Sequence, residues 1–93
     1  MTTTTTPLSF EIDEEHVVEG LQAVRDKLAT VGGEVLLDFF FTQQLDPSGL
    51  QVLEALAGDA EVMKVKVVLR GINVDVYKVL KLAGLDGRFV FVD

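Results

Sequence analysis

Residues 45–50, LDPSGL, place an acid, a proline, a hydroxyl and a glycine at the start of a helical pattern. Asp46 is a favoured N-cap residue, and Pro47 suits the first helical position because the N–H that it lacks would have no helical acceptor there. Ser48 is then the second helical residue, where free backbone N–H groups and the helix dipole favour negative charge. Gly49 has no side chain to obstruct an approaching protein backbone. These features indicate an accessible phosphorylation site, and Ser48 is the candidate residue.

The same stretch is the candidate surface for a protein partner. The polar loop TQQLD before the helix contributes Gln43 and Gln44. We expect these two residues and residues 46–49 to contact the partner. Asp46 and Pro47 already account for the start of the helix, so Ser48 is not needed for that purpose and is available for another.

Two other sets of side chains could do chemistry. The single histidine, His16, lies among acids without a cysteine or serine partner, which favours a surface role. Asp38, near the end of a predicted strand, and Asp46, at the start of the next helix, both fall at the carboxyl end of the sheet, the edge at which open α/β sheets bind ligands. A metal ion or an acid–base pair there would make the protein an enzyme or a nucleotide-binding domain. A cap role for Asp46 and loop amides bonded to Asp38 explain both carboxylates without one.

The known catalytic and phosphate-binding motifs are missing from the sequence. It contains no GxGxxG, GxxxxGK[ST], HExxH or GxSxG. The pair Gly32 and Gly33 ends a helical pattern rather than beginning one, which argues against a phosphate cradle. We therefore assign no catalytic residue, no metal ligand and no cofactor.

Composition excludes several classes of function. The chain has 15 acidic and 8 basic residues and a net charge of −7, which opposes the phosphate neutralisation that nucleic-acid binding requires. With no cysteine, it has no disulfide and no thiol chemistry. No apolar run approaches the ~18 residues of a membrane span and no secretory h-region is visible, so we expect a cytoplasmic protein with no membrane insertion.

Hydrophobic periodicity predicts alternating strands and helices. Strands are expected at 8–12, 34–41, 65–69 and 89–92, and amphipathic helices at 13–31, 46–62 and 73–85. Asp13 and Asn73 are the expected caps of the first and last helices. The order βαβαβαβ predicts an α/β fold with a mostly parallel four-stranded sheet, joined by right-handed crossovers. The apolar strand 34–41 is expected to be central and covered on both faces.

The chain is short enough for one domain, which we place at residues 8–93. The threonine-rich opening, MTTTTTP, is of low complexity and ends in proline, so residues 1–7 are expected to form a flexible tail. In the last helix, Val76, Leu80 and Ala83 are expected on the buried face. The three consecutive phenylalanines at 39–41 either find cover on both faces of the sheet or mark a contact surface.

From residue 34 onward the sequence resembles the STAS domain, a family named for sulfate transporters and anti-sigma factor antagonists. VLLDFFF followed by LDPSGLQVLEALA is similar to its signature, in which a strand leads through a short loop into an Asp-[Ser/Thr]-[Ser/Thr]-Gly-Leu helix start. KVVLRGINVDVYKVLKLAGLDGRFVFV is similar to the family's last strand, helix and strand. The first third matches loosely, because the family usually opens with a hairpin and this chain lacks one of its strands.

This resemblance implies a regulatory protein-binding module and no enzyme. In bacterial anti-sigma factor antagonists the second hydroxyl residue of the signature is phosphorylated by the anti-sigma kinase, and Ser48 occupies that position. Pro47 stands where the family usually has serine or threonine. The implied partners are an anti-sigma factor with serine-kinase activity, which the unmodified protein binds and the phosphorylated protein releases, and a matching phosphatase.

A second resemblance implies a different partner. The segment YKVLKLAGL and the long first helix are also similar to the small STAS subunit of the bacterial ABC-type phospholipid-transport system. That subunit docks on an ABC ATPase and needs no phosphorylation. The sequence leaves both interpretations open.

Overall fold

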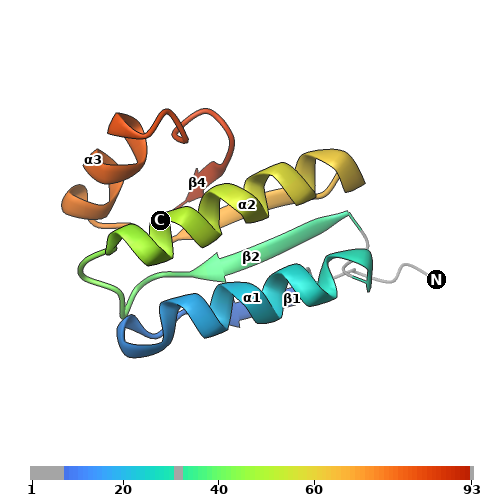
Figure 1. Cartoon of the computed structure of the whole chain (residues 1–93), viewed down its shortest axis with the longest axis horizontal. Helices are drawn as coiled ribbons and strands as arrows, with labels where there is room; N and C mark the ends of the chain where they lie inside the picture. The colour runs from blue at the N-terminus through green and yellow to red at the C-terminus, as the bar shows by residue number, and fades with distance from the viewer. Residues whose placement is uncertain (1–7, 31–32, 93) are drawn as a thin grey trace.

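Each of the first three strands is followed by a helix that leads back to the start of the next strand (Figure 1). The computed structural model describes residues 8–30 and 33–92, and the expected tail at residues 1–7 lies outside the described residues. The elements are β1 (Leu8–Glu11), α1 (Val17–Lys27), β2 (Glu34–Asp38), α2 (Pro47–Met63), β3 (Lys66–Arg70), α3 (Val74–Leu82) and β4 (Val90–Val92), with 3-10 turns at Glu14–His16 and Leu28–Thr30. The predicted βαβαβαβ order is confirmed.

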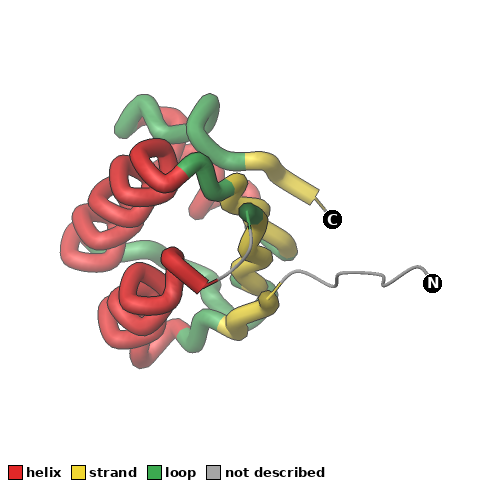
Figure 2. The backbone as a smooth tube through the Cα atoms, turned by 90° about the vertical axis from the view of Figure 1, so that its right-hand side faces the viewer, coloured by secondary structure: helices red, strands yellow, loops and turns green. Residues whose placement is uncertain are grey.

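The strands form one four-stranded sheet in the order β1-β2-β3-β4, and every neighbouring pair is parallel. Because the strand order always advances in the same direction, crossovers of one hand place all the helices on one face. Figure 2 shows the helices as one layer and the strands as a second. The parallel α/β sheet is confirmed. The expectation that the central strand is covered on both faces is wrong, because no described helix lies on the opposite face.

The hydrophobic core lies between the sheet and its helices. Parallel register sets Val35 beside Val67 and Leu37 beside Leu69, and all four side chains belong to the core. The helices contribute a matching set of fully buried side chains: Leu21, Val24, Leu53, Leu56 and Leu80. Burial of each such side chain stabilises the fold by about 1.5–3 kcal/mol, so the core holds the sheet and the helices in one arrangement.

Both predicted helix caps are present, although the first begins a different kind of helix. The Asp13 carboxylate accepts a hydrogen bond from the N–H of Glu15 at 3.1 Å, but the turn that follows is 3-10 and α1 begins at Val17. The Asn73 side chain accepts a hydrogen bond from the N–H of Val76 at 2.8 Å and begins α3. Local side-chain chemistry therefore fixes where these elements start.

The helix ends follow the sequence less closely. Ala83, expected on the buried face of the last helix, is exposed because α3 ends at Leu82 and the chain turns at Gly84, where φ is 76°. Val31 and Gly32, expected at the end of the first helix, lie outside the described residues. Buried side chains of α3 are Val76 and Leu80, as predicted.

The strand predicted at 34–41 ends early, at Asp38. The carboxylate of Asp38 accepts a hydrogen bond from the N–H of Phe40 at 2.9 Å, which turns the chain away from the sheet. Phe39 is fully buried, whereas Phe40 is 72% exposed and Phe41 is 58% exposed. The three phenylalanines therefore separate into one core side chain and two surface side chains.

Gly71 provides a test of how tightly this turn is fixed. Its φ is 73°, and a Cβ at this position would lie 3.0 Å from the Cα of Phe40. Gly71→Ala should lower the free energy of unfolding by about 1–3 kcal/mol, measured by urea denaturation. Gly58, inside α2, is the control because a methyl group there would meet open space, and Gly58→Ala should raise stability by about 0.5–1 kcal/mol. Equal stability of the two variants would contradict the close contact.

Candidate functional site

The N-terminus of α2 has the local structure that the sequence predicts. The Asp46 carboxylate accepts a hydrogen bond from the N–H of Gly49 at 2.7 Å, and its carbonyl accepts one from the N–H of Leu50 at 2.9 Å. Pro47 is the first helical residue and Ser48 the second. Ser48 is exposed, and within the described residues nothing forms a hydrogen bond with its hydroxyl. The fold therefore uses Asp46 as the cap and leaves the Ser48 hydroxyl free.

Gly49 does not have the role that the sequence suggested. It is buried, and a Cβ there would lie 2.9 Å from a methyl of Val17 and 3.0 Å from a methyl of Leu45. The missing side chain lets α2 approach α1 closely, and it does not open the surface to a partner. Gly49 thus packs against α1, while its neighbour Ser48 is exposed, and a partner contact at Gly49 stays a prediction.

The β2–α2 loop, residues 39–46, is held in place by an acid that sequence patterns did not single out. One oxygen of the Glu14 carboxylate accepts hydrogen bonds from the N–H groups of Gln43 at 2.7 Å and Gln44 at 3.2 Å. Glu14 belongs to the 3-10 turn before α1. Since a first-turn acid is ordinarily explained by the helix dipole, the sequence carried no signal for this second role.

Two further hydrogen bonds fix the same loop. The hydroxyl of Thr42, a residue only 1% exposed, donates to the carbonyl of Ile12 at 2.8 Å. The side-chain amide of Asn73 donates to the carbonyl of Gln43 at 3.0 Å, while its oxygen caps α3. The loop is therefore bonded to the segments that follow β1 and β3, so the loops at the carboxyl ends of the three strands form one surface.

Ser48 lies beside an open pocket of about 250 Å³. Its walls are formed by Pro47, Ser48, Leu50, Gln51, Glu54 and Ala83. Glu54 is the only charged side chain in this lining, and it has the same sign as the Asp46 cap next to it. The pocket lining therefore offers no basic side chain to a phosphate on Ser48.

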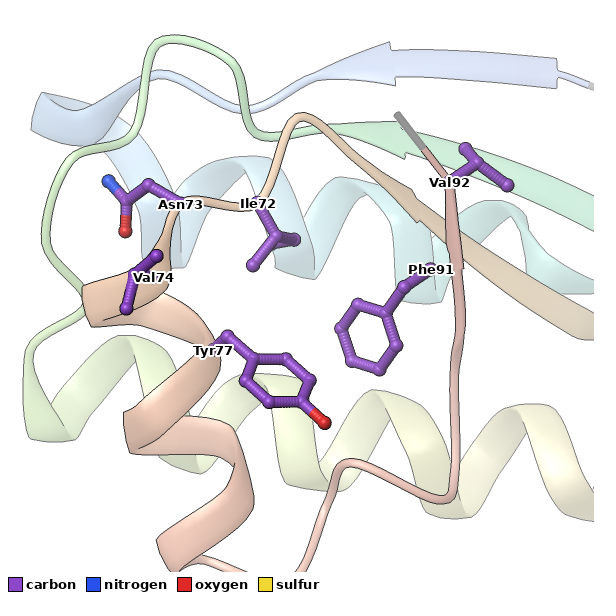
Figure 3. A pocket seen from close by; sticks show the side chains of 6 residues that line it. All are labelled: Ile72, Asn73, Val74, Tyr77, Phe91 and Val92. Atoms are coloured by element: carbon purple, nitrogen blue, oxygen red, sulfur yellow. The ribbon is translucent and has the colours of Figure 1, made fainter.

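A second pocket, of about 260 Å³, lies between α3 and β4 and is shown in Figure 3. It is lined by Ile72, Asn73, Val74, Tyr77, Phe91 and Val92. The rings of Tyr77 and Phe91 meet edge to face with their centroids 5.3 Å apart. Neither a carboxylate nor a basic side chain is in the lining, so this pocket suits apolar contact rather than acid–base or metal chemistry.

The alternative site at Asp38 and Asp46 gains no support from the geometry. Each carboxylate accepts a hydrogen bond from a nearby backbone N–H, as the structural interpretation predicts. Among the described strands the order has no reversal, and such a reversal is what creates the crevice at which open α/β sheets bind ligands. His16 is exposed, 3.6 Å from Asp13. Across residues 8–30 and 33–92, no three histidine, aspartate or glutamate side chains gather as a metal site.

Most of the predicted contact residues do share one surface. Gln43, Gln44, Asp46, Pro47 and Ser48 are all exposed along the end of the loop and the start of α2. The exposed rings of the same loop, at positions 40 and 41, pack edge to face with centroids 5.5 Å apart. Among the described residues, no helix has both the length and the apolar character needed to cross a membrane.

Comparison with known proteins identifies the family of this chain. A family model described as "Mlab, STAS domain" matches residues 5–93. No curated protein sequence matches the chain. The family match spans both the β2–α2 loop and the strand–helix–strand unit at the C-terminal end.

Solved structures with the same fold come from proteins of low identity. A putative anti-sigma factor antagonist from Thermotoga maritima has a TM-score of 0.71 at 21% identity, covering 95% of this chain and 75% of that one. A sulfate transporter family protein from Wolinella succinogenes has a TM-score of 0.76 at 21% identity, covering 90% and 75%. The Bacillus cell fate determinant SpoIIAA in its phosphorylated form has a TM-score of 0.62 at 19% identity, covering 92% and 78%.

The division of roles between Asp46 and Ser48 is open to direct measurement. Asp46→Ala should lower the free energy of unfolding by about 0.5–2 kcal/mol, because the N–H of Gly49 loses its acceptor. Asp46→Asn retains a capping oxygen and should lose much less. Ser48→Ala should be close to neutral in the same urea titration, and a loss as large as that of Asp46→Ala would show that the hydroxyl supports the fold.

The buried hydroxyl of Thr42 should be important for the stability of the loop. Thr42→Val leaves the carbonyl of Ile12 without its donor and should cost about 1–3 kcal/mol in a urea titration. Hydrogen exchange of the Gln43 and Gln44 amides should also become faster. Thr42→Ser keeps the hydroxyl and is the matched control; if both variants are equally destabilised, the hydrogen bond is not the cause.

Proposed function

This chain belongs to the STAS domain family, and we propose that it is a non-enzymatic regulatory module whose binding to a protein partner is switched by phosphorylation of Ser48. The observation that carries the proposal is the exposed hydroxyl at the second position of α2, which has no role in capping the helix. The module would act in the bacterial cytoplasm, with an anti-sigma factor that is also a serine kinase as partner and a phosphatase to reverse the modification.

The local charges favour an effect of phosphate on the complex rather than on the fold. A phosphate adds roughly −1.5 to −2 charges, and near a helix N-terminus such charge is favourable by about 0.3–1 kcal/mol. Repulsion from Asp46 and Glu54 offsets part of that gain. Across an interface, misplaced like charge costs several kcal/mol, and each ~1.4 kcal/mol changes affinity tenfold. Partner release is therefore the larger expected consequence.

The β2–α2 loop, which leads to Ser48, has the composition of a partner-binding site. Phe40 and Phe41 offer exposed aromatic rings on a loop that is fixed by hydrogen bonds to Glu14, Ile12 and Asn73. Aromatic side chains on a rigid support are typical anchors of protein interfaces, since they lose little conformational entropy on binding. Gln43 and Gln44 supply polar contacts at the rim.

A second function is kept because of what α3 exposes. Leu82 is 89% exposed and lies beside Lys78 and Lys81 on the outer side of the helix. An apolar and basic helix face of this kind supports the alternative of a fixed subunit that docks on an ABC-type ATPase of phospholipid transport. In that case the contact would include α3, and Ser48 would not be phosphorylated.

The switch is tested by mimicking the phosphate. Ser48→Asp should unfold at nearly the wild-type urea concentration but should lose its partner in affinity capture from native lysate, whereas Ser48→Ala should retain it. Thr30→Asp adds a negative charge at an exposed position of the 3-10 turn that follows α1, and it should also retain the partner. If Ser48→Asp captures the same protein as the wild type, the switch is ruled out.

The same capture separates the two functions. Recovery of a small histidine-kinase-like ATPase, together with phosphate on Ser48 in mass spectra of the native protein, supports the switch. Recovery of an ABC ATPase with an unmodified Ser48, and its loss in Leu82→Glu, supports the fixed subunit.

A further inference from the structure

The sheet face opposite the helices is the least explained surface of the molecule. All-parallel sheets occur almost only with both faces covered. In this chain the helices lie on one side of the strands (Figure 2), and no described residue outside the sheet is placed as a layer on the other. We call the uncovered side the open face. Its centre is formed by three residues of β2 and three of β3: Glu34, Leu36, Asp38, Lys66, Val68 and Arg70.

An apolar row crosses the middle of the open face. Side chains alternate along a strand, so the residues between the core positions of β2 and β3 point outward. Leu36 pairs with Val68, and Val68 pairs with Val90 on the next strand. None of the three belongs to the core cluster, but their exposure differs: Val90 is 38% exposed, Leu36 is partly buried, and Val68, between them in the sheet, is only 6% exposed. The open face therefore exposes apolar surface mainly at Leu36 and Val90, on either side of Val68, and no described helix covers it.

Charged side chains lie on both sides of this row, at the two ends of β2 and β3. In register, Glu34 lies beside Lys66 and Asp38 lies beside Arg70. Each pair has its acid on β2 and its base on β3. The ion pairs among the described residues are formed elsewhere, and none of these four side chains takes part in one. They are available to pair across an interface.

We propose that the open face binds the open face of a second copy of this chain. In a two-fold dimer whose axis runs parallel to the strands between β2 and β3, each β2 lies over the β3 of its partner. Glu34 of each copy then faces Lys66 of the other, and Asp38 faces Arg70. Leu36 meets Val68 in the middle, in an aligned packing of sheets about 10 Å apart.

The charge layout selects this arrangement over its main competitor. A two-fold axis in the plane of the sheet but across the strands would place β2 over β2 and reverse its direction. Glu34 would then face Asp38, and Lys66 would face Arg70, so every contact would join like charges. Complementary charges therefore favour β2 over the β3 of the partner, with both strands running in the same direction. Charge complementarity of this kind gives an interface its specificity.

One other possible occupant of the open face, the segment of residues 1–7, fits less well. Residues 1–7, MTTTTTP, contain no charged side chain and only one large apolar side chain, so they could neither pair with Lys66 and Arg70 nor bury the apolar row. The dimer also leaves the loops near Ser48 free in both copies, because those loops lie at the carboxyl edge of the sheet. The proposal therefore holds whether or not Ser48 is phosphorylated.

Charge reversal at one pair gives a test that does not disturb the turn held by Asp38. In Glu34→Lys, bases face bases in both symmetric contacts, and in Lys66→Glu, acids face acids. By sedimentation velocity from micromolar to millimolar concentration, the wild type should form a dimer. Each variant alone should self-associate at least about tenfold more weakly. An equimolar mixture of the two variants should form mixed dimers at the wild-type level, identified by native mass spectrometry.

Controls separate this interface from net charge and from folding. Glu19→Lys and Lys81→Glu alter the charge equally at exposed positions of α1 and α3, and each should dimerise as the wild type does. Circular dichroism verifies that every variant is folded. A wild type that stays monomeric at millimolar concentration, or a mixture no stronger than its components, overturns the proposal. Dimerisation only after deletion of residues 2–7 also overturns it, since that segment would then be the occupant.

Discussion

The sequential strand order, with each parallel strand beside the one before it, is the constraint on which the rest of this structure depends. It forces every crossover onto the same side, so the helices bury one face of the sheet and leave the other open. It also removes any reversal of strand order, and with it the crevice in which open α/β sheets usually bind ligands. What remains for function is surface: the loops at the carboxyl edge and the open face.

At the start of α2, the residues that stabilise the helix are different from Ser48, the proposed site of modification. Asp46 supplies the cap and Gly49 allows the close approach to α1, so the helix is fixed on both sides of Ser48. The preceding loop is held by the Glu14 carboxylate and by the hydrogen bond from Thr42 to the carbonyl of Ile12. A phosphate on Ser48, as we propose, would add charge to this surface without removing any of these hydrogen bonds. A partner bound at this surface would then meet the added charge directly, because the loop is held by hydrogen bonds to other segments.

The sequence predicts the elements of this fold because each has a local cause. Alternating apolar patterns and the caps Asp13, Asp46 and Asn73 were sufficient for the order and for most helix starts. The end of β2 was not predictable, because an apolar run gives no sign that the Asp38 carboxylate will turn the chain at Phe40. The open face was missed for a related reason: a strand that is apolar on both sides is the same in sequence whether a helix or another molecule covers it.

At the site, sequence reasoning placed what is adjacent in the chain and missed what is distant. Ser48, its cap and its proline follow from spacing alone. The buried contact of Gly49 with Val17, and the hydrogen bond from Thr42 to Ile12, join segments that only the fold brings together. These long-range contacts decide which residues face outward. An exposed residue is therefore a property of the whole packing, and a contact surface can be assigned only after the residues that support it have been identified.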